Sequence, residues 1–220
     1  MSDVYTGRTM DKRYTGDSVD VTYSPQRCIH AAECVRRLSE VFDNQRRPWI
    51  NPNGSSADRV AEVVERCPSG ALHYERKDGG ADEAPAAANT ITLWHNGPLQ
   101  LTGALQIEGA TVHLEGETRA TLCRCGASHN KPFCDNSHKD SGFDGTPASA
   151  VTAVPNTEGG VLKIIVTPNG SLGVQGNFTL LDEQGKVLFA GEKTWLCRCG
   201  GSASKPFCDG THKRNGFTGE

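Results

Sequence analysis

Two stretches of the chain combine cysteine and histidine at the same spacing. "CRCGASHNKPFCDNSH" starts at Cys123 and "CRCGGSASKPFCDGTH" starts at Cys197. In each stretch a Cys-x-Cys pair is followed, after eight residues, by a third cysteine and, after three more, by a histidine. Three thiolates and one imidazole can hold either one tetrahedral zinc ion or one 2Fe-2S cluster, and the spacing leaves both open. The two candidate ligand sets are Cys123, Cys125, Cys134 and His138, then Cys197, Cys199, Cys208 and His212.

A single histidine in each set changes the expected redox chemistry. A 2Fe-2S cluster on three thiolates and a neutral imidazole is less negative than one on four thiolates, so it accepts an electron more readily. Free histidine also titrates at about pH 6.5, where metal-bound thiolates do not readily take up a proton. We therefore expect a raised reduction potential and a sensitivity to acid.

The remaining cysteines form a looser group. The chain holds nine cysteines, and Cys28, Cys34 and Cys67 complete a division into three sets of three. An odd number leaves any full disulfide scheme one partner short, and clustered cysteines in a reducing compartment more often bind metal. A regular 4Fe-4S run would place a cysteine three positions after Cys28, where this chain has Ala31. Three buried structural cysteines are the alternative interpretation.

Composition narrows the classes of function. The chain has 220 residues, a formal net charge of −3 and no apolar run at its start. This charge disfavours a basic nucleic-acid surface, and the lack of a leader or a membrane-spanning stretch predicts a cytoplasmic protein with no membrane partner. Neither a nucleotide-binding fingerprint nor a nucleophile–base pair stands out, so we expect the protein not to be an enzyme.

The cysteine loops must be positioned by the elements that precede them. Residues 91–107 and 162–180 share one pattern: an apolar strand, an Asn-Gly turn and alternating apolar residues. This pattern predicts a β-ribbon before each loop, with Gly103 and Gly176 interrupting the alternation. The internal repeat therefore indicates two similar β-rich modules.

The N-terminal segment has a different pattern. It predicts a strand at 18–24, helices at 31–42 and 55–67, and a strand at 71–76, an α+β arrangement of ferredoxin type. The small, acidic stretch that follows has the composition of a flexible linker. The expected divisions are a domain at 1–78, a linker at 79–89, a module at 90–145, a second linker at 146–160 and a second module at 161–220.

The two repeated stretches resemble the CDGSH iron–sulfur family, which includes mitoNEET-type proteins. Besides the ligands, a serine, a proline and an aspartate match in register: Ser128, Pro132 and Asp135, then Ser202, Pro206 and Asp209. The resemblance implies one 2Fe-2S cluster per motif on three cysteines and one histidine. Asn136 departs from the family's usual glycine, and asparagine tolerates left-handed backbone well enough to keep the fold. Because such modules commonly pair as homodimers, the tandem copies here suggest a monomer with an internal pseudo-two-fold pair.

The first segment resembles the divergent mono-cluster ferredoxin-like family. "CIHAAEC", "VFD", "RPWI" and "CPSGAL" occur in that order. This resemblance implies one 3Fe-4S or 4Fe-4S cluster on Cys28, Cys34 and Cys67. A fourth iron would need another ligand, for which His30 is the nearest candidate and an exogenous group the alternative.

Polar neighbours of the motifs have competing interpretations. The basic residues either stabilise cluster charge and guide an acidic partner or are exposed solubilising charges: Arg124, Arg198, Lys131 and Lys205. Asp135 and Asp209 are expected to cap a following helical turn. Ser128 and Ser202 donate either to a cluster sulfur or within a turn. The histidines without a matching spacing are expected at the surface: His73, His95, His113 and His129.

Taken together, these patterns predict an α+β protein in which a ferredoxin-like domain precedes two CDGSH modules. We expect it to transfer single electrons to or from a redox-partner protein. The alternatives are storage of clusters and their transfer to an apo-acceptor, redox or pH sensing, and a zinc-bound scaffold.

The histidine ligands generate a first prediction. Protonation of His138 or His212 weakens its bond to iron, so acid should bleach both clusters or shift their potentials. Replacing both histidines, His138→Cys and His212→Cys, should abolish that pH dependence. The loss of visible absorbance between pH 8 and pH 5 is the measurement, and unchanged acid decay in the doubly substituted protein would contradict the prediction.

Overall fold

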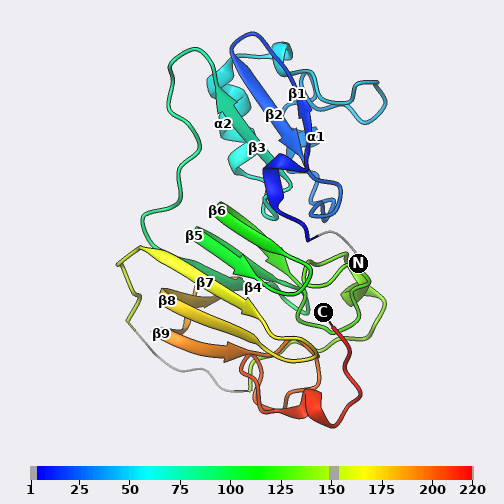
Figure 1. Cartoon of the computed structure of the whole chain (residues 1–220), viewed down its shortest axis with the longest axis vertical. Helices are drawn as coiled ribbons and strands as arrows, with labels where there is room; N and C mark the ends of the chain where they lie inside the picture. The colour runs from blue at the N-terminus through cyan, green and yellow to red at the C-terminus, as the bar shows by residue number, and fades with distance from the viewer. Residues whose placement is uncertain (1–3, 149–153, 220) are drawn as a thin grey trace.

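Two parts make up the fold of the chain, and both are visible in Figure 1. The computed structural model describes residues 4–148 and 154–219, so residues 149–153 of the second expected linker lie outside the described residues. A three-stranded sheet with helices forms the N-terminal part, and a six-stranded sheet forms the rest. Within the described ranges no helix is long and apolar enough to cross a membrane.

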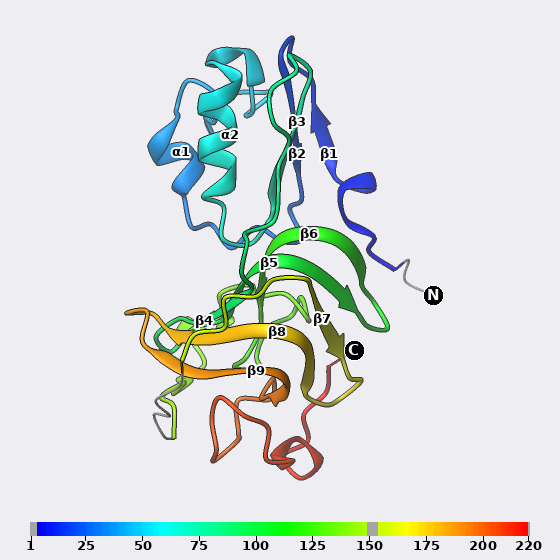
Figure 2. The same cartoon turned by 90° about the vertical axis from the view of Figure 1, so that its left-hand side faces the viewer.

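The N-terminal domain packs two helices on one face of an antiparallel sheet (Figure 2). The predicted long helix is confirmed as α2 (Ala57–Glu65), which begins where the Ser56 side chain accepts the Arg59 N–H. The other expected helix is much shorter than predicted, since α1 spans only Glu33–Arg37. Strand β1, too short to be recognised in the sequence, adds an edge to the sheet. The strands are β1 (Lys12–Tyr14), β2 (Val19–Tyr23) and β3 (Leu72–Arg76), and the 3₁₀ turns are η1 (Gly7–Thr9) and η2 (Pro52–Gly54).

Each half of the internal repeat supplies three strands to one sheet, which confirms the β-rich modules. The Asn-Gly turns also form as expected, because Asn96 and Asn169 adopt left-handed φ angles of 42° and 49°. The first module contributes β4 (Thr90–Leu93), β5 (Leu99–Glu108) and β6 (His113–Leu122). The second contributes β7 (Val161–Val166), β8 (Leu172–Asp182) and β9 (Val187–Leu196).

The modules exchange strand pairings instead of forming separate sheets. Strand β5 pairs with β4 of its own module through Thr102 and then, from Ala104, runs parallel to β7 of the other. Strand β8 follows the same order: it pairs with β7 of its own module through Gln175 and then, from Thr179, runs parallel to β4 of the first module. Each strand pairing that the first module makes, internally or with its neighbour, therefore has a counterpart in the second module. Both modules bury their apolar faces in one shared core.

Glycine is required where β5 and β8 change partners. Gly103 has a φ of 141°, and a Cβ there would lie 2.0 Å from Asn89 Oδ1. Gly176 has a φ of 110°, and its Cβ would lie 2.3 Å from the Val161 carbonyl oxygen. Both the backbone conformation and the close approach exclude a side chain. The interruptions seen in the alternating pattern are thus the points at which each strand bends toward the other module.

A buried network of charges joins the N-terminal domain to β6. The Arg27 guanidinium lies 2.7 Å from a Glu117 oxygen, and Arg119 lies 2.6 Å from Glu83. The ring of His73 bridges the two acids, with Nδ1 2.8 Å from Glu83 and Nε2 3.0 Å from Glu117. His73 was expected at the surface, but this prediction is wrong because its ring is needed between the two carboxylates.

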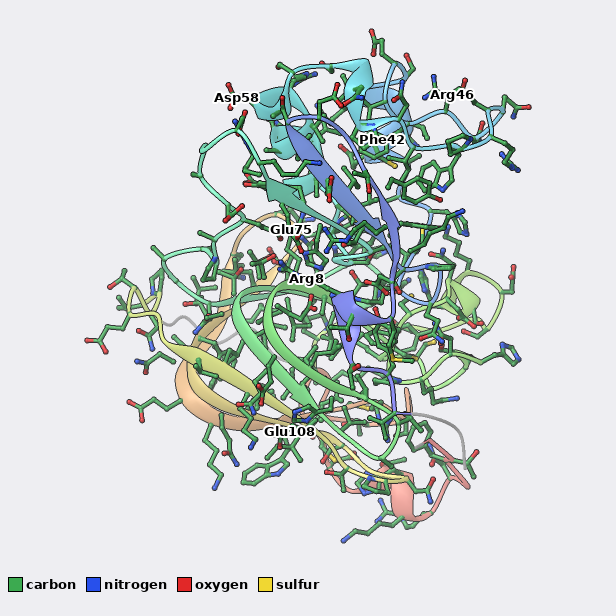
Figure 3. The ribbon with its side chains drawn as sticks, turned by 45° about the horizontal axis from the view of Figure 1, so that its top comes forward. Arg8, Phe42, Arg46, Asp58, Glu75 and Glu108 are labelled. Carbon is green, nitrogen blue, oxygen red and sulfur yellow. The ribbon has the colours of Figure 1, made fainter. Side chains whose placement is uncertain are left out.

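The acidic members of this network are held in their charged form. Burial alone would raise the pKa of Glu83, but its hydrogen bond to His73 and the charge of Arg119 hold it at about 2. Burial would likewise raise the pKa of Glu117, but the charge of Arg27 and the hydrogen bond to His73 hold it at about 2. Glu83 comes from the expected flexible linker, which is therefore anchored here. Arg8 of η1, labelled in Figure 3, lies 3.8 Å from the Glu83 carboxylate.

The network generates a prediction for the variant Glu117→Gln. It leaves Arg27 buried without a carboxylate, so the free energy of unfolding should fall by about 3–5 kcal/mol at pH 7. Wild type should lose this stabilisation as the pH falls from the usual carboxyl pKa of 4.5 toward about 2. Urea unfolding at pH 7 and pH 3 measures the difference between wild type and Glu117→Gln, which should be smaller at pH 3 because loss of metal affects both proteins alike.

The matched control is Glu115→Gln on the same strand, where the acid is exposed. It should change stability by less than about 0.5 kcal/mol. Equal losses in the two variants would show that the buried network adds nothing.

Candidate metal centres

The candidate ligands of the first repeated motif are brought together as two pairs. At the end of β6, Cys123 Sγ and Cys125 Sγ lie 3.7 Å apart. Across the following loop, Cys134 Sγ lies 3.5 Å from Nδ1 of His138, which sits in the turn η3 (Ser137–Lys139). All four predicted ligands therefore belong to one loop that follows one strand.

The second motif repeats this geometry. Cys197 Sγ and Cys199 Sγ are 3.8 Å apart after β9. Cys208 Sγ is 3.5 Å from Nδ1 of His212 in the turn η4 (Thr211–Lys213). Agreement between two copies of different sequence indicates that the shared residues set the arrangement.

An aspartate shapes each loop, as the sequence predicted. Asp135 accepts the His129 N–H at 2.8 Å and, at the first residue of η3, the Ser137 N–H at 2.9 Å. The N-cap position itself is Asn136, so Asp135 acts from one residue before the cap. Although burial would raise the pKa of Asp135, the hydrogen bonds from Ser137 and His129 lower it well below its usual value. Asn136 adopts a left-handed φ of 73°, which confirms that asparagine fits where the second copy has a glycine. Asp209 makes the equivalent bonds to Ala203 and Thr211.

The serines serve the turns. Ser128 donates its hydroxyl to the Phe133 carbonyl at 2.8 Å, and Ser202 donates to the Phe207 carbonyl at 2.7 Å. Each hydroxyl thus ties the two sides of the loop together, which decides between the two interpretations open for these residues.

Backbone N–H groups point at the sulfur atoms. The Ala127 N–H donates to Cys125 Sγ at 3.4 Å, and the Asn136 N–H donates to Cys134 Sγ at 3.3 Å. A shared hydrogen bond with Cys123, helped by such N–H groups, lowers the pKa of Cys125 to about 6. Burial instead raises the pKa of Cys134 to about 11. The surroundings thus favour the charged form of Cys125 and disfavour that of Cys134, and a bound metal ion would favour the charged form of both.

A buried arginine accompanies each pair of ligand cysteines. Arg124 donates to the carbonyls of Gly97, Gly145 and Trp94, and Arg198 donates to those of Gly170, Thr167 and Gly219. The interpretation as exposed solubilising charge is therefore wrong for both arginines.

These two guanidinium groups carry charge without an acidic partner. Among residues 4–148 and 154–219 neither forms an ion pair, and Nη1 of Arg198 is buried with no hydrogen-bond acceptor there. Burial lowers the pKa of Arg124 to about 10, and interactions with Cys197 of the other module, Cys125 and Asp144 partly offset this effect. Burial also lowers the pKa of Arg198, and the interaction with Cys123 partly offsets this effect. Buried positive charge facing thiolates fits sites that hold a group of net negative charge.

The two CDGSH-type loops meet at their first ligand pairs. Cys125 and Cys199 form an isolated antiparallel bridge between the modules. Gly126 and Gly200, next along the chain, are left-handed, and a Cβ on them would lie 2.7 Å and 2.3 Å from the carbonyls of Cys199 and Cys125. Glycine at these positions lets the two backbones touch.

The third group of cysteines gathers around one cavity. Cys28, Cys34, Cys67 and His30 all line it, together with apolar side chains such as Trp49. Cys28 Sγ lies 3.9 Å from His30 Nδ1. The structure thus brings together every residue predicted for the N-terminal site, His30 included. His30 and Ala32 have left-handed φ angles of 54° and 63°, which curl this loop around the cavity.

The loop of the first module contacts the ligand loop of the N-terminal domain. The Asn136 side-chain amide donates to the Ile29 carbonyl at 2.7 Å, one residue from Cys28. Thr121 donates to the Pro68 carbonyl at 3.0 Å, one residue from Cys67. Asn130 donates to the Gln26 carbonyl. This contact between the loops was not predicted from the sequence. The residue that could have indicated it is Asn136, which replaces the glycine of the second copy.

Comparison with known proteins agrees with this geometry. A family model described as "Divergent 4Fe-4S mono-cluster" matches residues 14–77, and one described as "Iron-binding zinc finger CDGSH type" matches residues 96–139 and 169–213. The chain is similar to "Uncharacterized protein YjdI" of Escherichia coli strains K12 and O157:H7, with 41% identity over 64 residues. Each match covers 29% of this chain and 84% of the relative. No solved structure matches the chain.

Proposed function

Because the chain belongs to the divergent 4Fe-4S mono-cluster family through its N-terminal domain and to the CDGSH iron-binding family through both later modules, we propose that it is an electron-transfer protein. In this proposal each CDGSH set holds one 2Fe-2S cluster. One 3Fe-4S or 4Fe-4S cluster binds Cys28, Cys34 and Cys67 in a ferredoxin-like domain, with His30 beside it. Bound clusters would supply one-electron oxidation and reduction, and the chain would perform no bond-making catalysis.

The observation that carries the proposal is the division of each CDGSH set into two close pairs. One tetrahedral zinc ion would draw four ligands around a single point. Within the described residues no three cysteine, histidine, aspartate or glutamate side chains converge in that way. Two separate pairs suit a group with two metal atoms, and the unpaired charges of Arg124 and Arg198 suit one that is negative.

Contacts between the ligand loops support an internal path for electrons. The Asn136 backbone N–H bonds to Cys134 Sγ, while its side chain bonds to the carbonyl beside Cys28. Cys125 and Cys199 join the other end of the first site to the second. We place the first CDGSH site between the N-terminal site and the second CDGSH site. Bonded contact at both junctions favours electron transfer over release of clusters to an acceptor.

The exchange of strands supports a monomer. Each CDGSH module completes its sheet with strands of the other, so one chain contains the pairing for which a separate module needs a second copy. We propose that the two modules form a pseudo-two-fold pair, because the β4–β8 and β7–β5 pairings correspond under exchange of the modules.

Metal and sulfide content tests the proposed function. Protein purified without oxygen should be brown-red, contain about seven or eight irons and labile sulfide, and change its absorbance with dithionite. Alanine at Cys125 and Cys199 should remove about four of those irons. Colourless protein with stoichiometric zinc and no labile sulfide would contradict the proposal.

The internal path is tested by Asn136→Gly, which restores the residue of the second copy. Loss of one hydrogen bond should lower the free energy of unfolding by about 1 kcal/mol. After rapid mixing with substoichiometric dithionite, electrons should redistribute more slowly between the N-terminal and CDGSH centres, whose absorbance spectra differ. Gly210→Asn in the second module is the matched control and should leave that rate unchanged. A wild-type rate in Asn136→Gly with full iron content would refute this path.

A further inference from the structure

Strands β6 and β9 occupy corresponding positions, but only one of them is covered. Each forms an outer strand of its module, β6 beside β5 and β9 beside β8. Residues 117–122 of β6 are all buried, because the N-terminal domain lies against them (Figures 1 and 2). In the corresponding residues 191–196 of β9 only Leu196 is buried.

The positions that hold the N-terminal domain have open counterparts in the second module. Thr121, Asn130 and Asn136 make the contacts in the first module. The same places in the second repeat are Trp195, Ser204 and Gly210. We call these three residues, with Lys193, the β9 face. Trp195, Ser204 and Lys193 are exposed, and Gly210 is half-buried.

This face lies next to the ligands of the second site. The Cys208 N–H donates to the Trp195 carbonyl at 2.9 Å, and the Gly210 N–H donates to Cys208 Sγ at 3.4 Å. The equivalent surface of the first module brings the ligand loops of two redox domains into contact. A protein seated on the β9 face would therefore be as close to the second site as the N-terminal domain is to the first.

The chemistry of the β9 face differs from that of its counterpart. Trp195 is 53% exposed, and Lys193 Nζ lies 5.4 Å from the centre of its indole ring. Exposed tryptophan beside a cation is typical of binding hot spots. The adjoining loop adds the exposed Lys213 and Arg214 and one exposed acid, Asp209, and Glu192 is the exposed acid of residues 191–196. With Lys193, the exposed bases around this face outnumber the exposed acids by three to two.

The N-terminal domain of a second copy does not fit this face. It would bury Arg27, which needs the carboxylate of Glu117, but the second repeat has Gly191 at that place. It would also place Glu83 beside Lys193, which stands where the first module has Arg119. The Arg119 guanidinium bonds both to Glu83 and to the Leu72 carbonyl of the domain, and one lysine ammonium lacks that forked geometry. The N-terminal domain of a second copy is therefore not the occupant.

We propose that the β9 face docks a separate one-electron carrier protein with an acidic surface. One electron passes from the reduced metal centre of the carrier to the second CDGSH site, which oxidises the carrier by one electron and involves no atom transfer. The proposal rests on the proposed function of the chain. Positive charge would speed the encounter and the tryptophan would anchor a small, short-lived interface.

The test uses a reduced, acidic plant-type 2Fe-2S ferredoxin as the probe and the iron-replete full chain. Stopped-flow absorbance gives the second-order rate of reduction at several salt concentrations. Trp195→Thr, which copies the first module, and Lys193→Glu should each lower the rate at least 5-fold at low salt, without loss of iron. Carbodiimide coupling followed by mass spectrometry should link Lys193 to ferredoxin carboxylates.

Lys186→Glu is the matched control, because Lys186 is exposed in the β8–β9 turn at the far end of the hairpin. It should lower the rate less than 2-fold. Equal slowing by Lys186→Glu and Lys193→Glu, or wild-type rates in both β9-face variants, would overturn the docking proposal. A chain that dithionite reduces but ferredoxin does not would also overturn it while leaving the proposed function intact. A chain that dithionite cannot reduce would instead refute the proposed function.

Discussion

Exchange of strands between the two repeats is the constraint on which the rest of this structure depends. Because β5 and β8 each pair along one edge with a strand of the other module, the two repeats bury their apolar faces in one shared core. The exchange fixes the ends of β6 and β9 relative to each other and sets Cys125 opposite Cys199. Two ligand sets distant in sequence therefore become neighbours as a consequence of how the core is built.

Buried charge is used in two different ways in this molecule. At the domain interface, Arg27 and Arg119 are matched by Glu117 and Glu83, so the protein itself balances the cost of removing charge from water. Beside the CDGSH-type loops, the buried guanidinium groups of Arg124 and Arg198 donate to carbonyl groups and form no ion pair within the described residues. The first arrangement stabilises a contact between domains. The second leaves positive charge to be balanced by what the cysteines bind.

The two repeated motifs share one ligand spacing but have different surroundings. The first copy has Asn136, Thr121 and Glu117, which all contact the N-terminal domain. The second copy has Gly210, Trp195 and Gly191 at those places and stays open to solvent. The same ligand geometry can thus serve an internal neighbour in one module and an external one in the other.

The sequence by itself determined the candidate ligand sets, the β-rich repeats and the long helix of the first domain. These features are local: the spacing of cysteines within one loop, alternation along one strand and a serine cap are all read within about twenty residues. The sequence did not reveal that β5 and β8 change partners, although Gly103 and Gly176 marked the places. It also did not reveal that His73 and Glu83 are buried, since each looks like an ordinary surface residue until its partners are known. Tertiary structure decided these points, because an ion network or a strand exchange depends on residues brought together from distant segments.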